Sequence, residues 1–221
     1  MIKFENVSVT YPGGVEALKD LNLEINDGDF IIIVGLSGAG KSTLLRTVNN
    51  LVKPSTGSVY LEGKNVTSAK KKELKKIRSQ IGMIFQTFNL VNRSTVLKNV
   101  LTGRLSNIST IRSILGLWPK DQKEMAFEAL NQVEILEKAY VRASNLSGGQ
   151  QQRVGIARAL SQKPKVMLAD EPVASLDPIT SRVVMSYLKK VNTELGITTI
   201  VNLHFLDLAK EFGDRLIGLR D

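Results

Sequence analysis

Apolar and polar positions alternate near the start of the chain, and this pattern predicts antiparallel strands. Hydrophobic side chains recur through residues 2–11 and alternate again at Leu21, Leu23 and Ile25. The segment Pro12-Gly13-Gly14 lies between these two runs and is typical of a turn. We therefore predict an antiparallel β subdomain at the N terminus.

The rest of the chain mixes short apolar runs with longer segments of helical period. Short apolar strands are predicted for residues 30–34, 81–85, 166–169 and 197–201, and a further strand for residues 58–62. Helices are predicted for residues 41–51, 149–161 and 206–211, and for the segment after Pro178. This alternation of strands and helices is typical of an α/β fold.

Residues 94–145 form the longest stretch without a strand pattern, and their period is helical. We expect Ser94 to cap one helix and Pro119 to start another. Three apolar residues fall on one face of the second helix: Ala126, Leu130 and Val133. We predict a single domain in which residues 1–93 and 146–221 form the catalytic α/β core with the β subdomain. Residues 94–145 form a helical subdomain.

Composition is compatible with a soluble intracellular protein. With 221 residues, of which 43% are hydrophobic, the chain can bury a large core. It has no cysteine, which excludes disulfides, and we find no signal peptide or apolar run long enough for a membrane span. The net charge of +9 is compatible with nucleic acid, an anionic membrane face or simple solubility. Much of it lies in residues 70–76, which we interpret as a solvated helix face because no aromatic residues interleave.

A glycine-rich loop between a predicted strand and a predicted helix indicates phosphate binding. Residues 35–42 fit the pattern G-x-x-x-x-G-K-[ST], whose backbone N–H groups cradle phosphates at a helix N-terminus. We expect Lys41 to reach the terminal phosphates and the hydroxyl of Ser42 to hold Mg²⁺. The residues expected to contact nucleotide are Gly35, Ser37, Gly38, Ala39, Gly40, Lys41, Ser42 and Thr43.

Two adjacent carboxylates follow the apolar run 166–169. Open α/β sheets bind ligands at the carboxyl ends of their strands, so Asp170 and Glu171 would lie at such an edge. ATP hydrolysis needs one carboxylate for Mg²⁺ and a second group that deprotonates the attacking water. We assign the metal role to Asp170 and the base role to Glu171. The alternative is a solvated strand end without chemistry.

The segment Leu146-Ser147-Gly148-Gly149-Gln150 indicates a second anion cradle. Ser147 can cap the following helix, while the glycines let its backbone approach a phosphate. With this segment, the chain resembles an ATP-binding cassette (ABC) ATPase over essentially its whole length, a P-loop NTPase fold with a RecA-like core. The resemblance implies that two copies pair head to tail. Residues Ser147, Gly148, Gly149 and Gln150 of one copy would then close over ATP bound to the P-loop of the other.

The same resemblance implies further site residues. Tyr11 resembles the aromatic residue that stacks on adenine, and Gln86 the glutamine that contacts Mg²⁺ and the attacking water. Asp177 belongs to the loop that crosses the dimer interface, and His204 to the position that contacts the γ-phosphate. From the residues alone, Tyr11 could equally be a core aromatic. His204, the single histidine, could be an ordinary packed or surface residue.

The motifs do not name what hydrolysis drives, and three classes compete. The first is the motor subunit of a membrane transporter, lying on the cytoplasmic face of the membrane against permease subunits. A periplasmic or lipid-anchored binding protein would act on it indirectly. The second is a soluble ABC protein of DNA repair or translation, and the third a regulatory module without hydrolysis. The short helical insertion and the presence of Glu171 and His204 favour the first class. We therefore expect no nucleic-acid partner.

Several sequence segments in the second half of the chain resemble those of phosphonate-import ATPases. This resemblance favours phosphonate, phosphite or a related oxyanion as cargo. The alternative is an importer of polar amino acids. We also expect a chain shortened after Asp221, with weakened isolated dimerisation, because relatives continue through further β structure. The resembling segments are residues 103–105, 112–117, 139–143, 170–178, 202–204, 207–209 and 214–220.

Overall fold

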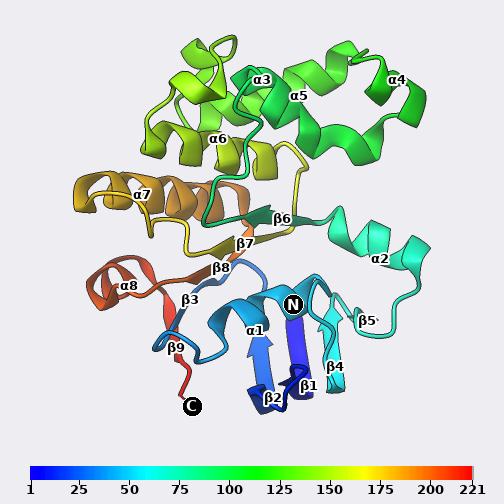
Figure 1. Cartoon of the computed structure of the whole chain (residues 1–221), viewed down its shortest axis with the longest axis vertical. Helices are drawn as coiled ribbons and strands as arrows, with labels where there is room; N and C mark the ends of the chain where they lie inside the picture. The colour runs from blue at the N-terminus through cyan, green and yellow to red at the C-terminus, as the bar shows by residue number, and fades with distance from the viewer. Residues whose placement is uncertain (221) are drawn as a thin grey trace.

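The computed structural model describes residues 1–220 and contains two sheets and a layer of helices (Figure 1). The first sheet is antiparallel, in the order β2-β1-β4-β5. The N-terminal antiparallel prediction is thereby confirmed. Its strands are β1 (Ile2–Thr10), β2 (Glu16–Ile25), β4 (Thr56–Leu61) and β5 (Lys64–Asn65).

The second sheet has the order β6-β7-β8-β3-β9, and all its pairs are parallel. It joins the four short apolar runs predicted as strands, now β3, β6, β7 and β8, with a strand that the sequence does not predict, β9. That strand lies at the sheet edge and is largely exposed, so it carries no buried alternation. The strands are β3 (Phe30–Val34), β6 (Ile81–Ile84), β7 (Val166–Asp170), β8 (Thr198–Asn202) and β9 (Arg215–Gly218).

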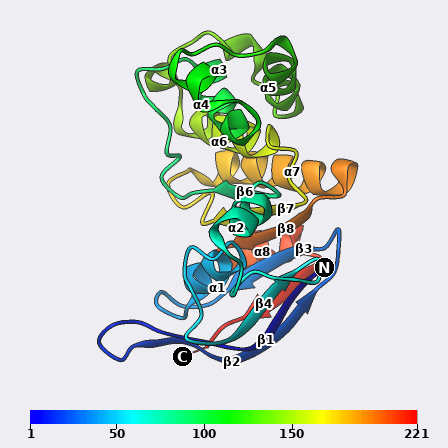
Figure 2. The ribbon, with the colours of Figure 1, turned by 90° about the vertical axis from the view of Figure 1, so that its right-hand side faces the viewer.

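Strand β3 shows how one apolar run builds two cores. Successive side chains of a strand point to opposite faces of the sheet. Phe30 and Ile32 therefore join the core beneath the helices, whereas Ile31 and Ile33 join the core between the two sheets. Helix α1 (Lys41–Val48) lies between the sheets, as Figure 2 shows, and buries its leucines in this second core. The P-loop is thus anchored on both sides by packed structure.

Helices cover the other face of the parallel sheet, where α6 packs against α3, α5, α7 and β6 (Figures 1 and 2). Helix α6 contacts both the helical insertion and the sheet, so these contacts do not divide the chain after residue 145. The predicted boundary of the helical subdomain therefore stays a prediction. Ala126, Leu130 and Val133 are fully or almost fully buried. The helices of this region are α3 (Val96–Leu101), η1 (Thr102–Asn107), α4 (Thr110–Ile114), α5 (Lys120–Gln132), η2 (Leu136–Lys138), η3 (Ala143–Asn145), α6 (Gly148–Leu160) and α7 (Pro178–Leu195).

The prediction that Ser94 caps a helix is wrong by one residue. Thr95 is the N-cap of α3, and its side chain accepts a hydrogen bond from the backbone N–H of Lys98. Ser94 instead pairs its backbone N–H with Val91 and its carbonyl with Ala143. Two adjacent hydroxyl residues offer two possible caps, and the backbone contacts with neighbouring loops decide between them.

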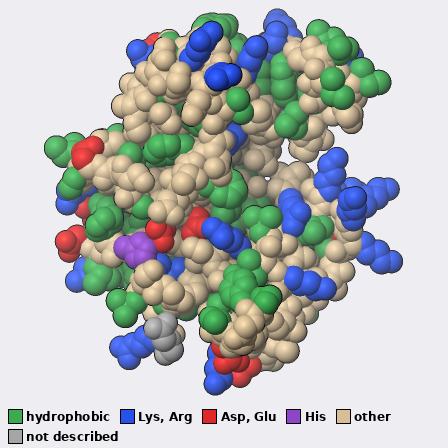
Figure 3. Space-filling model, in the orientation of Figure 1, with side chains coloured by type: hydrophobic (Ala, Val, Ile, Leu, Met, Phe, Trp, Pro, Cys, Tyr) green, Lys and Arg blue, Asp and Glu red, His purple; other side chains and the backbone are tan. Residues whose placement is uncertain are grey.

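Two helices complete the fold, α2 (Lys71–Arg78) and α8 (Leu206–Phe212). Helix α2 buries Ile77 and exposes its lysines, which confirms the solvated helix face. Lys and Arg side chains gather at the right edge of Figure 3, where α2 lies in Figure 1. Within residues 1–220, no helix combines the length and apolar character needed to cross a bilayer.

Candidate functional site

The loop between β3 and α1 has a backbone that depends on glycine. Gly38 and Gly40 adopt φ values of 93° and 87°, in the left-handed region that side chains disfavour. A Cβ atom on Gly40 would also lie 2.1 Å from the carbonyl oxygen of Ala17. Gly40 immediately precedes α1, so the loop presents the backbone N–H groups of a helix N-terminus.

The side chain of Lys41 folds back over this loop. Its Nζ donates to the carbonyl oxygens of Gly35 and Leu36, both at 2.8 Å, and the residue is 5% exposed. An ammonium carries three N–H donors, so one more remains for an anion. The cation is therefore oriented by the loop that the sequence predicts to hold phosphate.

Asp170 ends β7 and is 4% exposed. Its Oδ1 accepts from Ser42 Oγ at 2.7 Å and from Asn202 Nδ2 at 3.0 Å, while Oδ2 accepts from Arg46 at 2.9 Å. Buried carboxylates need such partners. The contacts bring together α1, β7 and β8, as expected for the carboxyl edge of a parallel sheet.

Glu171 follows Asp170 and contacts the histidine. Its Oε1 lies 2.6 Å from His204 Nε2, and Figure 3 shows the histidine at the surface beside acidic side chains. Glu171 has a φ of 51°, an uncommon value for a residue other than glycine. Such strain often accompanies functional positions.

These elements surround one hollow of about 260 Å³. Tyr11 lies at its rim, where its hydroxyl is 3.1 Å from Thr43 Oγ1. Most residues predicted for the P-loop side of the site share this hollow. Its lining is Tyr11, Val15, Ala17, Ser37, Gly38, Gly40, Lys41, Ser42, Thr43, Glu171 and His204.

Other predicted residues lie away from the hollow. Ser147 is exposed and caps α6 in a reciprocal pair, since its Oγ accepts from Gln150 N and its N–H donates to Gln150 Oε1. Gly149 faces its own chain, because a Cβ there would lie 2.3 Å from Thr180 Cγ2. Gln86 is exposed in the turn after β6. None of these residues lines the hollow.

Asp177 is the N-cap of α7, close to the segment around Ser147. Its Oδ1 accepts from the backbone N–H groups of Ile179 and Thr180, at 3.1 Å and 3.0 Å. Hydrogen bonds from Thr180, first through the side chain and then through the backbone, lower the pKa of the Asp177 carboxyl. The starts of α6 and α7 lie side by side, because a Cβ on Gly149 would meet Thr180, and both Ser147 and Asp177 are exposed there.

Comparison with known protein families identifies this arrangement. The ABC transporter family matches residues 18–174, a span that contains the P-loop, both carboxylates and the segment around Ser147. The chain belongs to the ABC transporter family. The resemblance to ABC ATPases and the fold that it implies are confirmed.

Relatives within the ABC transporter family match along the whole chain. "Phosphonates import ATP-binding protein PhnC 3" of Halalkalibacterium halodurans is 57% identical over 220 residues, which are 100% of this chain and 85% of the relative. "Phosphonates import ATP-binding protein PhnC" of Bacillus thuringiensis is 60% identical over 219 residues, with coverages of 99% and 85%. A solved dimeric ATP-binding cassette in a post-hydrolysis state, bound to ADP and Pi, has a TM-score of 0.86 and 39% identity. It matches 100% of this chain and 94% of its own.

The donors around Asp170 fit a magnesium ion. Mg²⁺ prefers oxygen ligands and usually binds through one or two carboxylates together with substrate phosphates and water. The residues present offer the Ser42 hydroxyl and the Asp170 carboxylate, while Asn202 Oδ1 is buried without a hydrogen-bond partner among the described residues. Residues 1–220 contain no cluster of three acidic, histidine or cysteine side chains that would hold a metal alone.

Two residues of the Asp170 network were not predicted as site residues. Arg46 lies one helical turn after Ser42, so its i,i+4 spacing was the available signal. Asn202 entered the prediction only as part of a family segment, although a polar residue ending an apolar strand is itself a signal. The pairing of β7 with β8, which brings Asn202 to Asp170, is not visible in the sequence.

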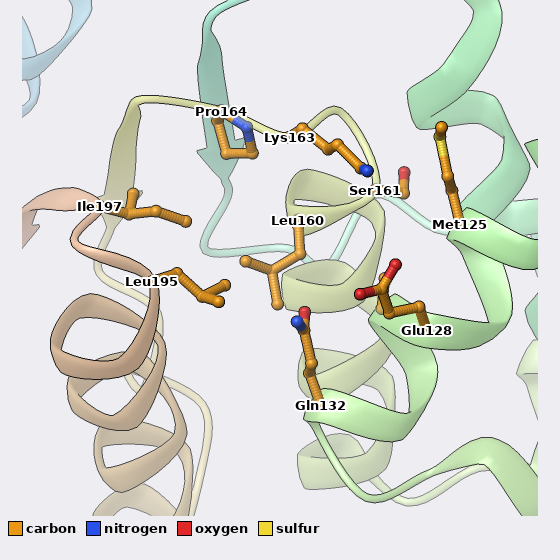
Figure 4. Close-up of a pocket in the computed structure, with 10 residues that line it drawn as sticks. Met125, Glu128, Gln132, Leu160, Ser161, Lys163, Pro164, Leu195 and Ile197 are labelled. Atoms are coloured by element: carbon orange, nitrogen blue, oxygen red, sulfur yellow. The ribbon is translucent and has the colours of Figure 1, made fainter.

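A second hollow lies in the helical layer and is unrelated to this chemistry. Figure 4 shows it between α5, the end of α6 and the end of α7, with Glu128, Lys163 and Leu195 among its lining residues. Its volume is about 290 Å³, similar to that of the P-loop hollow. No residue predicted for catalysis or nucleotide binding lines it, so volume alone does not identify the site.

Proposed function

We propose that this chain is the ATP-hydrolysing subunit of a bacterial ABC importer for phosphonate or a related oxyanion. The observation that carries the chemical part is the convergence of Lys41, Glu171 and His204 on one hollow. The cargo class follows from relatives at 57–60% identity whose names specify phosphonate import. An importer of another polar solute and a soluble ABC ATPase are the alternative outcomes.

In the proposed reaction, the P-loop binds the phosphates of ATP. Backbone N–H groups between Ser37 and Ser42 donate to phosphate oxygens, and Lys41 adds the positive charge. To do so, Lys41 uses its remaining donor or exchanges its contacts with Gly35 and Leu36. Tyr11, exposed at the rim, stacks on the adenine ring.

Hydrolysis proceeds by in-line attack of water on the γ-phosphoryl group. Glu171 accepts the proton of that water, and His204 holds the Glu171 carboxylate through the 2.6 Å contact. His204 can also donate to the γ-phosphate as charge develops. Gln86, in the turn after β6, contacts this water as well.

Ser42 and Asp170 would hold Mg²⁺, with Gln86 contributing from its loop. The bound ion would neutralise charge on the phosphate oxygens of ATP. Asp170 is already oriented by its hydrogen bonds, so binding needs little rearrangement of the carboxylate. Arg46 balances the negative charge of Asp170 from the other side.

The segment around Ser147 serves the second copy of the chain. Ser147 is exposed and does not line its own hollow, which suits a contact with ATP on a partner. Asp177, exposed at the start of α7, would lie at the same dimer interface. Closure by ATP and reopening after hydrolysis would transmit force to permease subunits at the cytoplasmic face of the membrane. A solute-binding protein would deliver cargo on the opposite side.

The test is ATP hydrolysis by the complex reconstituted in lipid with its permease and binding protein. We expect phosphonate, and not polar amino acids, to stimulate phosphate release and to accumulate inside vesicles. Stimulation by an amino acid alone would reassign the cargo. Hydrolysis that responds to nucleic acid and not to any solute would overturn the transport assignment.

A further inference from the structure

Strand β8 ends on a residue that its surroundings disfavour. Every residue of Thr198–Asn202 is buried, as expected for a central strand of a parallel sheet, and such strands are usually apolar. Asn202 has no exposed surface. Burying an amide is costly unless its polar atoms find partners, so this position needs an explanation.

One half of the amide is explained by Asp170. Asn202 lies opposite Asp170 on β7 and opposite Ile33 on β3, so it stands between the carboxylate and the strand that leads into the P-loop. Its Nδ2 donates to Asp170 Oδ1 at 3.0 Å. A carboxylate only accepts hydrogen bonds, which fixes the nitrogen on the side of Asp170.

The other half has no partner within the described chain. Asn202 Oδ1 is buried and receives no hydrogen bond, whereas the Asp170 oxygens receive Ser42, Arg46 and Asn202 itself. A free acceptor next to an oxygen-lined site can be satisfied by a donor that comes from outside the chain. Water is the smallest such donor and is common in metal and phosphate sites.

We propose that Asn202 is a positioning residue for the divalent cation of the nucleotide site. Its Nδ2 holds Asp170 in the orientation that faces Ser42, and its Oδ1 accepts a hydrogen bond from a water held with the cation. The inference rests on the proposed binding of ATP and Mg²⁺. It adds a residue on β8 that distinguishes metal-loaded from metal-free nucleotide without contacting the reacting phosphate.

The test compares ADP affinity with excess Mg²⁺ and with EDTA by titration calorimetry, which avoids turnover. In Asn202→Leu, an apolar side chain of similar size replaces the amide. We expect the gain in ADP affinity from Mg²⁺ to fall roughly tenfold, the lower end for residues that orient metal ligands. The affinity in EDTA should stay within about twofold of the parent. An equal loss under both conditions would indicate a merely structural role and would overturn the proposal.

Asn192→Leu is the matched control, because Asn192 is also a buried amide but bonds Gly28 and Ile197 far from the hollow. In this control, the gain in ADP affinity from Mg²⁺ should equal that of the parent, and a fall matching that of Asn202→Leu would overturn the proposal.

If Asn202→Leu does not fold, Asn202→Asp retains the size of the side chain and places a second carboxylate beside Asp170. Its melting temperature should rise more than that of the parent when Mg²⁺ and ADP are added together. An equal or smaller rise would overturn the proposal.

The parent protein separates this inference from the proposed function. A parent that binds ADP, with Mg²⁺ increasing the affinity, leaves Asn202 as the only assignment at risk in the variants. A parent that does not bind ADP overturns the proposed function, and the role of Asn202 with it.

Discussion

The two regions predicted to contact nucleotide differ in how far one chain completes them. At the carboxyl edge of the parallel sheet, Asp170 is buried and bonded to three other side chains, and Lys41 is held by its own loop. At the start of α6, Ser147 is exposed and its side chain contacts only its own helix. The difference supports the proposal that the catalytic groups are organised within one molecule, whereas the second anion cradle needs a second copy of the chain.

The largest expected effect comes from removing the proposed general base of the first region. Glu171→Gln retains the size of the side chain but removes the carboxylate that accepts a proton. General-base groups contribute roughly 10²- to 10⁴-fold, so phosphate release in single-turnover measurements should slow by that factor. ATP binding should persist, and an ATP-bound dimer should accumulate on size exclusion.

The control for this variant is Glu128→Gln, which changes an exposed carboxylate at the second hollow of Figure 4. Its turnover should equal that of the parent. Hydrolysis by Glu171→Gln at near the parental rate would remove Glu171 from the base role.

Removing the cation of the P-loop should affect binding before chemistry. In Lys41→Ala, the phosphates lose a charge-assisted hydrogen bond, typically about 1.5–3 kcal/mol, or roughly 10- to 150-fold in ATP affinity. Equilibrium titration with a fluorescent ATP analogue measures the change. Lys72→Ala removes an exposed lysine of α2 and should bind as the parent does. Unchanged affinity in Lys41→Ala would contradict the phosphate-cradle assignment.

Local patterns predicted the first region better than its internal contacts. The runs that form β3, β7 and β8 are short, apolar and bounded by turns, so the sequence predicts their burial. The glycine requirement of the P-loop was also legible. The contact of Asn202 with Asp170 was not, because strand order and register arise only when the sheet assembles.

The sequence predicted less at the edges of the fold and around the second cradle. Strand β9 was missed because its exposed side chains carry no burial pattern. The cap of Ser147 was predicted, but the close packing of Gly149 against Thr180 was not. That contact joins residues of α6 and α7 that are distant in the chain, so it gives Gly149 a use within its own subunit that no local pattern indicates.

The second region can be tested by comparing two helix caps. Ser147→Ala and Thr95→Ala each remove a hydroxyl that caps a helix, so each should lower the free energy of unfolding by about 1 kcal/mol. Only Ser147→Ala should also weaken ATP-dependent dimerisation, measured by sedimentation in a Glu171→Gln background. ATP binding by the monomer should be unaffected in both. Equal dimerisation of the two variants would show that the Ser147 hydroxyl acts only within its own helix.

The smallest expected effect concerns the carboxylate that caps α7 beside this region. Hydrogen bonds lower the pKa of Asp177 in the folded state, so its ionised form binds fewer protons there than in the unfolded chain. Its contribution to stability is therefore complete above the unfolded pKa of about 3.9 and is lost as the pH falls through the lower folded value.

Asp177→Asn keeps a capping side chain that does not titrate. Urea unfolding of both proteins from neutral to acid pH isolates this term, because the other carboxylates are common to both. We expect the stability of the parent relative to the variant to decline only below about pH 4. A difference that stays constant across the series would mean that the folded protein does not favour the ionised carboxylate.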